Sequence, residues 1–225
     1  MIQSKEMRVG EHVVQVTAGS VTLEGNLNLP EEARGVVLFA HGSGSSRHSP
    51  RNRLVARLLN EAKLATLLVD LLTREEEAVD VQTAHLRFDI GLLAERLVGA
   101  TDWLTQQPDF SELRIGYFGA STGAGAALVA ASERPDVVSG VVSRGGRPDL
   151  AGPALPRVRA PTLLIVGGHD PQVILLNQAA AAQLRCENQL VLVPGATHLF
   201  EEPGALEKVA GLAREWFERH LGPTE

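Results

Sequence analysis

The chain has 225 residues, of which 44% are apolar, and this content is enough to bury the core of one large α/β domain. Its net charge of -6 argues against a nucleic-acid-binding protein, because such proteins usually carry a basic face that neutralises phosphates. Cys186 is the only cysteine, which excludes an intrachain disulfide and a cysteine-based metal cluster. We expect Cys186 to be a buried or half-buried apolar residue.

The N-terminal segment argues against export or membrane insertion. Residues 1–10 mix Lys5, Glu6 and Arg8 and contain no apolar run of the length that a signal peptide needs, and no later stretch approaches the length of a membrane span. No low-complexity segment or repeat divides the sequence, and the nearest linker candidate, 144–161, lies between two strand-like runs. We therefore expect a cytoplasmic protein with a single domain over residues 1–225 and no membrane partner. The sequence does not determine whether it forms homo-oligomers.

The pattern of apolar residues changes from alternating to continuous along the chain. Apolar and polar residues alternate over 13–16 and 21–29, around a Gly-Ser turn, and predict an opening antiparallel hairpin. After Pro30 the apolar runs become short and nearly continuous, as is typical of parallel strands that are covered on both faces. These runs lie at 36–40, 65–69, 115–118, 137–142, 162–166 and 189–193.

Segments with helical periodicity separate these strand-like runs, at 54–62, 90–101 and 209–217. The last segment is the most regular, with apolar residues spaced i, i+3, i+4, i+7 and i+8, and it predicts that Trp216 and Phe217 belong to the core. Alternating strands and helices predict an α/β fold, in which a mainly parallel sheet has helices on both faces. The active site is then expected at the carboxyl ends of the strands.

The sequence Gly-x-Ser-x-Gly at 119–123 places Ser121 between a strand-like run and an Ala-rich segment, 124–131. A serine at a sharp turn from strand to helix has a strained backbone and an exposed hydroxyl, and small neighbours relieve the crowding. Taken alone, five such residues also fit an ordinary Gly/Ser-rich turn. The pattern predicts a nucleophilic serine only if other loops supply its partners.

Two later loops supply these partners. Asp170 follows the run at 162–166, and His198 follows the run at 189–193 and precedes the last helix. A hydroxyl is a poor nucleophile at pH 7, so it needs a base, and the base needs a carboxylate that holds its tautomer. Ser121, Asp170 and His198 therefore predict a catalytic triad. The alternatives are that Asp170 only caps a helix, that Asp149 or Asp70 is the acid, and that His198 is a structural loop histidine.

With these residues the chain resembles the α/β-hydrolase superfamily, whose chain order is nucleophile, acid and histidine. Within the superfamily it is similar to the dienelactone-hydrolase-like group, which is compact and lacks a large cap, and the resemblance extends from His41 to His198. It implies that the His41-Gly42-Ser43-Gly44 turn is an oxyanion loop, with the backbone N–H groups of Ser43 and Thr122 as donors. The alternative is that its glycines merely make a turn. Dienelactone hydrolases proper carry cysteine at the nucleophile position, so Ser121 favours ordinary ester chemistry.

We predict a serine hydrolase that cleaves carboxylic esters through an acyl-enzyme, with a small-molecule ester as its substrate and no cofactor. No histidine and carboxylate cluster has the spacing of metal ligands, so we expect no metal. The interval 143–160 is too short for a cap domain, and 71–89 reads as a charged, solvated loop or helix start. An open site favours small or exposed esters and hydrolysis over acyl transfer.

Two arginines in the expected active-site loops, Arg47 and Arg144, are candidates for binding an anionic group of the substrate, since a guanidinium suits carboxylate and phosphate. The alternative is that they are ordinary surface or loop-bracing residues. A thioesterase, a lipase-like enzyme or a peptidase would use the same triad, and the sequence does not separate them. A non-catalytic binding domain with the same fold is an alternative of a different class.

Overall fold

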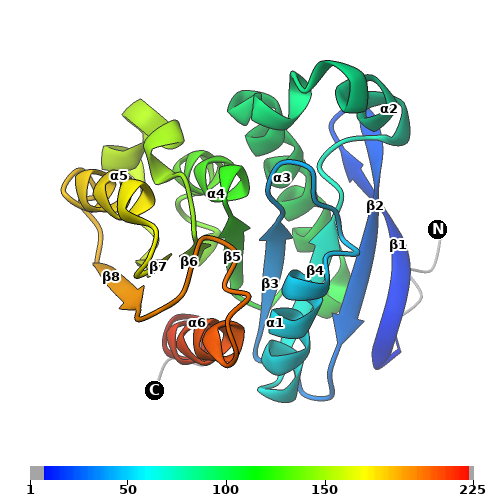
Figure 1. Cartoon of the computed structure of the whole chain (residues 1–225). Coiled ribbons are helices and arrows are strands. Elements are labelled where there is room, and N and C mark those ends of the chain that lie inside the picture. Colours follow the sequence, from blue (N-terminus) through cyan, green and yellow to red (C-terminus); the bar gives the residue numbers. More distant parts are fainter. Residues whose placement is uncertain (1–7, 223–225) are drawn as a thin grey trace, which may run out of the picture.

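The computed structural model describes residues 8–222, in which eight strands form one continuous sheet (Figure 1). The order across the sheet is β1-β2-β4-β3-β5-β6-β7-β8. The strands are β1 (Gly10–Ala18), β2 (Val21–Leu29), β3 (Gly35–Ala40), β4 (Leu64–Val69), β5 (Ile115–Ala120), β6 (Val138–Arg144), β7 (Thr162–Gly167) and β8 (Asn188–Val193).

The predicted opening hairpin and the predicted parallel sheet are both confirmed. Strand β1 pairs antiparallel with β2, and β2 pairs antiparallel with β4, whereas β3 to β8 run parallel. The chain leaves β3 toward β4 on one side and later returns to place β5 on the other side. Loops that leave the carboxyl ends of β3 and β5 therefore diverge, and such a switch point is where open α/β sheets bind their ligands.

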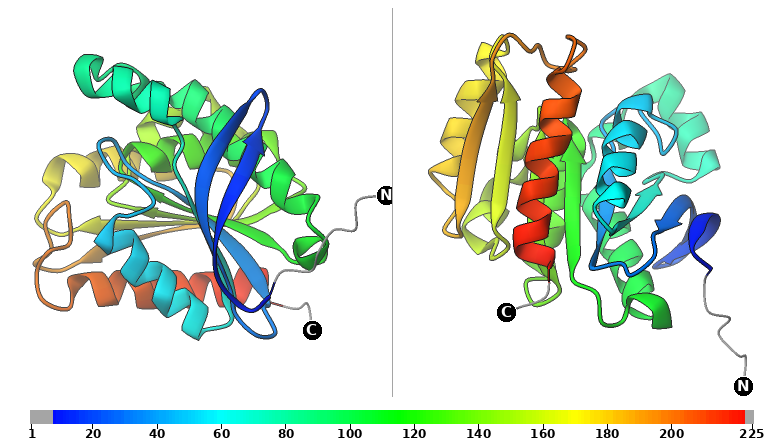
Figure 2. Two further views of the ribbon diagram at one scale, coloured as in Figure 1. Left: turned by 90° about the vertical axis from the view of Figure 1, so that its right-hand side faces the viewer. Right: turned by 90° about the horizontal axis from the view of Figure 1, so that it is seen from below.

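Helices cover both faces of the sheet (Figure 2). On one face lie α1 (Pro50–Glu61) and α6 (Ala205–Leu221), and on the other lie α3 (Ile90–Thr105), α4 (Thr122–Glu133) and α5 (Pro171–Ala181). Trp216 and Phe217 are 3% and 0% exposed, which confirms their place in the core. The segment 144–161 is not a linker, because it contains the 3₁₀ helix η3 (Pro148–Arg157), which packs against α4.

Two regions differ from the expectation drawn from the sequence. The helix start that was one expectation for residues 71–89 is present and extends into a full helix, α2 (Arg74–Thr83), which the 3₁₀ turn η1 (Leu86–Phe88) follows. A capping box begins α2, because the Thr73 hydroxyl accepts the Glu76 N–H and the Glu76 carboxylate accepts the Thr73 N–H. Strand β8 lies at the edge of the sheet, so most of its residues are partly exposed and it is not covered on both faces.

The lone cysteine agrees with the expectation for it. Cys186 is half-buried and unpaired, and burial raises the pKa of its thiol. None of the helices between residues 8 and 222 combines the length and the apolar content that crossing a bilayer requires.

His220 makes the stability of the fold depend on pH. Its ring packs on Trp216 in α6 with the ring centroids 4.6 Å apart, and its Nε2 atom is buried without a hydrogen-bond partner. Burial lowers the pKa of His220, and Glu187, whose carboxylate lies 3.8 Å from Nε2, offsets part of that effect. Between the lower folded pKa and the unfolded pKa of about 6.5, the unfolded chain binds more protons. The stability that the neutral ring contributes is therefore present above about pH 6.5 and is lost as pH falls below it.

We expect urea unfolding of the wild-type protein to show a lower midpoint at pH 5.5 than at pH 7.5, with part of this difference removed in His220→Phe. Replacing the exposed His85 by glutamine is the matched control, because it removes a histidine without changing a buried ring. Equal pH dependence in His220→Phe and the wild type would contradict this role of His220.

Candidate active site

Ser121 lies at the turn between β5 and α4, with the backbone strain that its sequence pattern predicts. Its φ and ψ angles are 51° and -122°, a region that residues other than glycine rarely adopt. A Cβ atom at position 119 would lie 2.5 Å from the Ala124 Cα atom, and one at position 123 would lie 2.2 Å from the Ala40 carbonyl oxygen. The two glycines of the motif are therefore required by close backbone contacts on both sides of the serine.

Backbone hydrogen bonds hold this turn in place. The Ser121 N–H donates to the Arg144 carbonyl at the end of β6, at 3.3 Å. The Ser121 carbonyl accepts the N–H groups of Ala124, at 3.1 Å, and Arg147, at 3.0 Å. Such a strained conformation persists only where its surroundings determine it, and these bonds fix the serine against the neighbouring strand.

Asp170 and His198 are in direct contact. The His198 Nδ1 atom lies 2.7 Å from the Asp170 Oδ2 atom, although 28 residues separate the two in the sequence. An ionised carboxylate only accepts hydrogen bonds, so Nδ1 carries the proton and Nε2 is left as the basic nitrogen. The Asp170 side chain is 16% exposed and that of His198 is 40% exposed, so the acid is enclosed while the imidazole reaches solvent.

The two alternative acids have other partners. The Asp149 carboxylate accepts two hydrogen bonds from the Arg147 guanidinium, at 2.9 and 2.8 Å. The Asp70 carboxylate binds the backbone N–H and the guanidinium of Arg47. Of the three aspartates that the sequence offered, the structure therefore joins only Asp170 to His198.

Ser121 and His198 lie on either side of the same short segment, at the end of β6. The Arg144 carbonyl binds Ser121, and a Cβ atom built on Gly145 would lie 3.0 Å from the His198 carbonyl oxygen and 3.7 Å from its Cε1 atom. Gly145 has a positive φ of 50°, and Phe200, two residues after His198, has a φ of 57°. Glycine adopts a positive φ at little cost, so Phe200 is the residue that adds backbone strain here, in the loop that carries His198.

The loop after β3 lies against the serine turn. A Cβ atom on Gly42 would come within 3.0 Å of the Ser121 Cβ atom, so the close approach requires glycine there. The Ser43 N–H donates to the Thr122 hydroxyl at 2.9 Å, which joins the loop to the start of α4. Thr122 is the first residue of α4, so its own N–H has no acceptor within the helix. Of the two predicted oxyanion donors, the Thr122 N–H thus has no acceptor within the helix, and the Ser43 N–H donates to the Thr122 hydroxyl.

His41 has a structural place in this loop. Its Nε2 accepts the Leu71 N–H at 3.2 Å, so the ring proton lies on Nδ1, which contacts the Gly42 carbonyl at 3.0 Å. Both ring nitrogens are occupied, which leaves His41 without a free basic nitrogen.

Arg47 braces this side of the molecule. Its guanidinium donates to Asn26 at 2.9 Å and Glu24 at 2.6 Å, and it also binds Asp70. A cavity of about 660 Å³ lies beside Arg47, and its lining includes His41 and Ser45 but none of Ser121, Asp170 and His198. The positive charge of Arg47 is thus already compensated by two carboxylates.

Arg144 has the opposite environment. The residue is 8% exposed, and its Nε and Nη1 atoms are buried without a hydrogen-bond partner. Burial, together with the nearby charge of Arg51, lowers the pKa of Arg144 to about 10, so the guanidinium stays protonated at neutral pH. The sequence indicates Arg144, with Arg47, as a candidate for binding an anionic group, but the absence of a partner for Arg144 is visible only in the structure.

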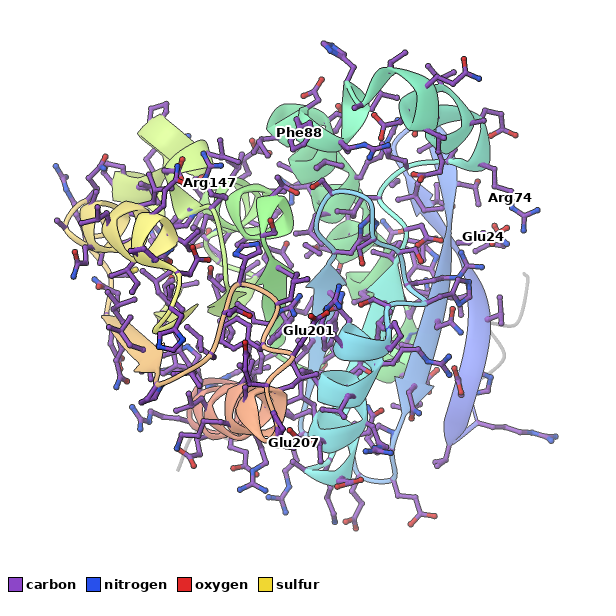
Figure 3. All side chains as sticks on the ribbon, viewed as in Figure 1. Glu24, Arg74, Phe88, Arg147, Glu201 and Glu207 are labelled. Carbon is purple, nitrogen blue, oxygen red and sulfur yellow. The ribbon has the colours of Figure 1, made fainter. Side chains whose placement is uncertain are left out.

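The segment 71–89, which the sequence offers as a candidate cover of the site, reaches the oxyanion loop through Arg87. Arg87 fastens the segment by donating to the buried Asp80 carboxylate at 2.6 Å. The Arg87 Nη1 atom lies 3.7 Å from a Cβ atom built on Gly44. Phe88, which is 56% exposed, and Arg147 both lie at the upper end of the molecule in Figure 3. Within residues 8–222, no group of three or more His, Cys, Asp or Glu side chains is arranged to hold a metal ion.

Comparisons with known proteins place this chain in a family. The dienelactone hydrolase family model matches residues 23–221. A dienelactone hydrolase from Anabaena variabilis ATCC 29413, known from a crystal structure, is 66% identical and has a TM-score of 0.93, and the match covers 94% of this chain and 98% of that one. The esterase Est1E from Butyrivibrio proteoclasticus, which is 15% identical, shares the fold with a TM-score of 0.78 and coverage of 92% and 98%.

A curated protein from Mycobacterium tuberculosis H37Rv, provisionally named a phosphoribosyl transferase, is 62% identical over 211 residues. The match covers 93% of this chain but 47% of that protein, so the chain spans about half the length of this relative. The transferase name belongs to the longer protein as a whole. The family model and the Anabaena enzyme, in contrast, match this chain along nearly all of its length, and the chain belongs to the dienelactone hydrolase family of α/β hydrolases.

Proposed function

We propose that the protein is a serine hydrolase that cleaves carboxylic esters through an acyl-enzyme intermediate. The Ser121 hydroxyl attacks the ester carbonyl while His198 Nε2 takes its proton, and His198 then returns that proton to the leaving alcohol. Asp170 holds the Nδ1–H tautomer and stabilises the imidazolium that forms. Water, activated by His198, then releases the acid product and restores Ser121.

The observation that carries this proposal is the Asp170–His198 hydrogen bond of 2.7 Å beside a strained serine. A loop histidine without a catalytic role needs no enclosed carboxylate on Nδ1, and a serine in an ordinary turn needs no backbone strain. Both features cost free energy and both favour proton transfer from the serine.

The oxyanion that forms on the ester carbonyl needs donors aimed at it, since one lost donor typically costs about a hundred- to a thousand-fold in rate. The Thr122 N–H is one donor in this proposal. The Ser43 N–H is the second donor. When the oxyanion forms, this N–H either leaves its present acceptor, the Thr122 hydroxyl, or donates to both oxygens. Hydrogen bonds of this kind often reach their final geometry only in the complex with substrate.

A serine-directed fluorophosphonate probe tests the proposal directly. We expect one probe per chain, attached at Ser121, and hydrolysis of p-nitrophenyl acetate that disappears when the probe is bound. Absence of labelling and of ester hydrolysis in folded protein would instead support a binding domain with this fold. A panel of matched oxygen esters, thioesters and peptide amides would separate an esterase from the thioesterase and peptidase alternatives, which use the same residues.

A further inference from the structure

Arg144, whose backbone carbonyl accepts the N–H of the proposed nucleophile, carries an uncompensated positive charge. Two of its three nitrogens are buried and make no hydrogen bond, and the residue is 8% exposed. Burying a charge without a partner is costly, and most buried arginines are paired with carboxylates for this reason. Arg147, three residues later, shows the usual arrangement, because its guanidinium binds Asp149 at 2.9 and 2.8 Å.

The direction of the Arg144 side chain follows from the alternation along β6. Val142 packs in the cluster that lies under α1 and α6, so Arg144, two residues later, points to that same face of the sheet. Arg51, in the first turn of α1, is the charged neighbour that Arg144 meets there. The charge of Arg51 therefore acts on Arg144 from the start of α1 and does not compensate it.

The nearby carboxylates do not neutralise Arg144. Glu201 belongs to the loop that precedes α6 (Figure 3), and its carboxylate lies 3.3 Å from the Arg51 Nη1 atom. The Glu201 side chain is, however, 64% exposed. The Arg51 Nε atom is nevertheless buried without a partner. Glu202 accepts the backbone N–H and the hydroxyl of Thr197, at 3.1 and 2.6 Å, and makes no ion pair with Arg144. Among the described residues, Arg144 thus has no carboxylate partner, whereas Arg51 is paired with Glu201.

We propose that Arg144, assisted by Arg51, binds an anionic oxygen group of the substrate, a carboxylate or a phosphate, and so selects esters that carry such a group close to the scissile carbonyl. The Arg144 carbonyl accepts the Ser121 N–H, and the adjacent Gly145 lies against His198, so the residue that carries the subsite contacts Ser121 directly and His198 through its neighbour. A guanidinium binds either anion through charge-assisted hydrogen bonds. This inference rests on the proposed function, in which Ser121 attacks an ester.

Thermal unfolding tests the subsite without any need for turnover. In the Ser121→Ala protein, succinate or inorganic phosphate, each compared with sodium chloride at equal ionic strength, should raise the melting temperature, and Arg144→Met should remove that rise. The anion that stabilises more identifies the preferred group. Arg53→Gln, which removes an exposed cation from the same helix, is the matched control and should leave the rise intact. If succinate and phosphate raised the melting temperature as much in the Arg144→Met variant as in the protein that keeps Arg144, the proposal would be overturned.

The same variants give a second readout with no anion present. Methionine has a volume similar to that of arginine and removes the unpaired charge, so Arg144→Met should melt at least about 2 °C higher than the parent protein. Arg144→Lys keeps a charge in the site and should retain part of the response to anions. If Arg144→Met melts lower than the parent protein, the rise in melting temperature that anions cause in Arg144→Lys decides. A rise that persists in Arg144→Lys supports the subsite, and its absence overturns the proposal.

Kinetics complete the test. The ratio of kcat/KM for mono-p-nitrophenyl succinate to that for p-nitrophenyl butyrate should fall about ten- to a hundred-fold in Arg144→Gln, as expected for losing a charge-assisted hydrogen bond. Arg53→Gln should not change this ratio, which excludes long-range electrostatics as the cause. An unchanged ratio in Arg144→Gln would overturn the proposal. Failure of the wild type to hydrolyse either ester would instead contradict the proposed function, and the melting experiment would still decide the subsite.

Discussion

Replacing Ser121 by alanine is expected to lower kcat for p-nitrophenyl acetate by about 10⁵- to 10⁶-fold, because no other group takes over the attack on the carbonyl. Fluorophosphonate labelling should disappear in the same variant. His198→Ala should lose a similar factor, and the double variant should be no slower than either single one, since the two residues act as a unit. Activity that survives in Ser121→Ala at more than about 1% of the wild type would contradict the assignment of the nucleophile.

The stability of the Ser121 variants provides a control that is independent of catalysis. Alanine at φ 51° keeps the strain of the turn, whereas glycine adopts this region at little cost. We therefore expect Ser121→Gly to be inactive but to melt higher than Ser121→Ala. This order would show that the loss of activity comes from the missing hydroxyl and not from unfolding, and that part of the folding free energy is given up to hold the serine in place.

The strands of this fold could be predicted well because burial on both faces leaves a simple signal. Each of the runs at 36–40, 65–69 and 162–166 became a strand within about one residue of its expected bounds, since a parallel strand between two helical layers has little room for polar side chains. Strand β8 gave the same apolar run at 189–193. Its position at the edge of the sheet depends on the order of strands, which a local pattern does not contain.

The start of helix α2 could be predicted but its extent could not, for a related reason. Its side chains are exposed on nearly all sides, and polar contacts hold it, among them the capping box at Thr73 and the Glu76–Arg96 ion pair at 2.8 Å. A helix with no apolar stripe has no hydrophobic periodicity to detect. The Thr-x-x-Glu pattern at 73–76 was the available signal, and it marks where a helix starts rather than how far it continues.

The residues of the site could be named from the sequence, but their pairing could not. Chain order and position after a strand indicated Ser121, Asp170 and His198, because the loops that follow parallel strands all lie at the same edge of the sheet. The same rule brings Asp149 to that edge, and only the three-dimensional contacts distinguish the two acids. The lack of a partner for Arg144 is likewise invisible in a sequence, since it depends on where every nearby carboxylate points.

Asp170→Asn is expected to lower kcat by about 10³- to 10⁴-fold, while Asp149→Asn should change it only a few-fold. An asparagine at 170 presents either an amide N–H or a carbonyl to His198 Nδ1. Donation of the amide N–H would favour the tautomer whose proton lies on Nε2, and this tautomer does not accept the proton of Ser121. Asp149 instead binds Arg147, whose backbone N–H supports the Ser121 carbonyl, so its loss acts on the serine only through the loop.

The two variants are matched, because each exchanges one carboxylate for an amide of the same size at the same edge of the sheet. Rates of p-nitrophenyl acetate hydrolysis across pH 6 to 9, measured with melting temperatures, separate a catalytic effect from a structural one. Asp149→Asn should lose stability with its ion pair to Arg147 and keep most of its activity. If it lost more activity than Asp170→Asn, the acid would be Asp149, and the 2.7 Å contact between Asp170 and His198 would serve only to order the loop.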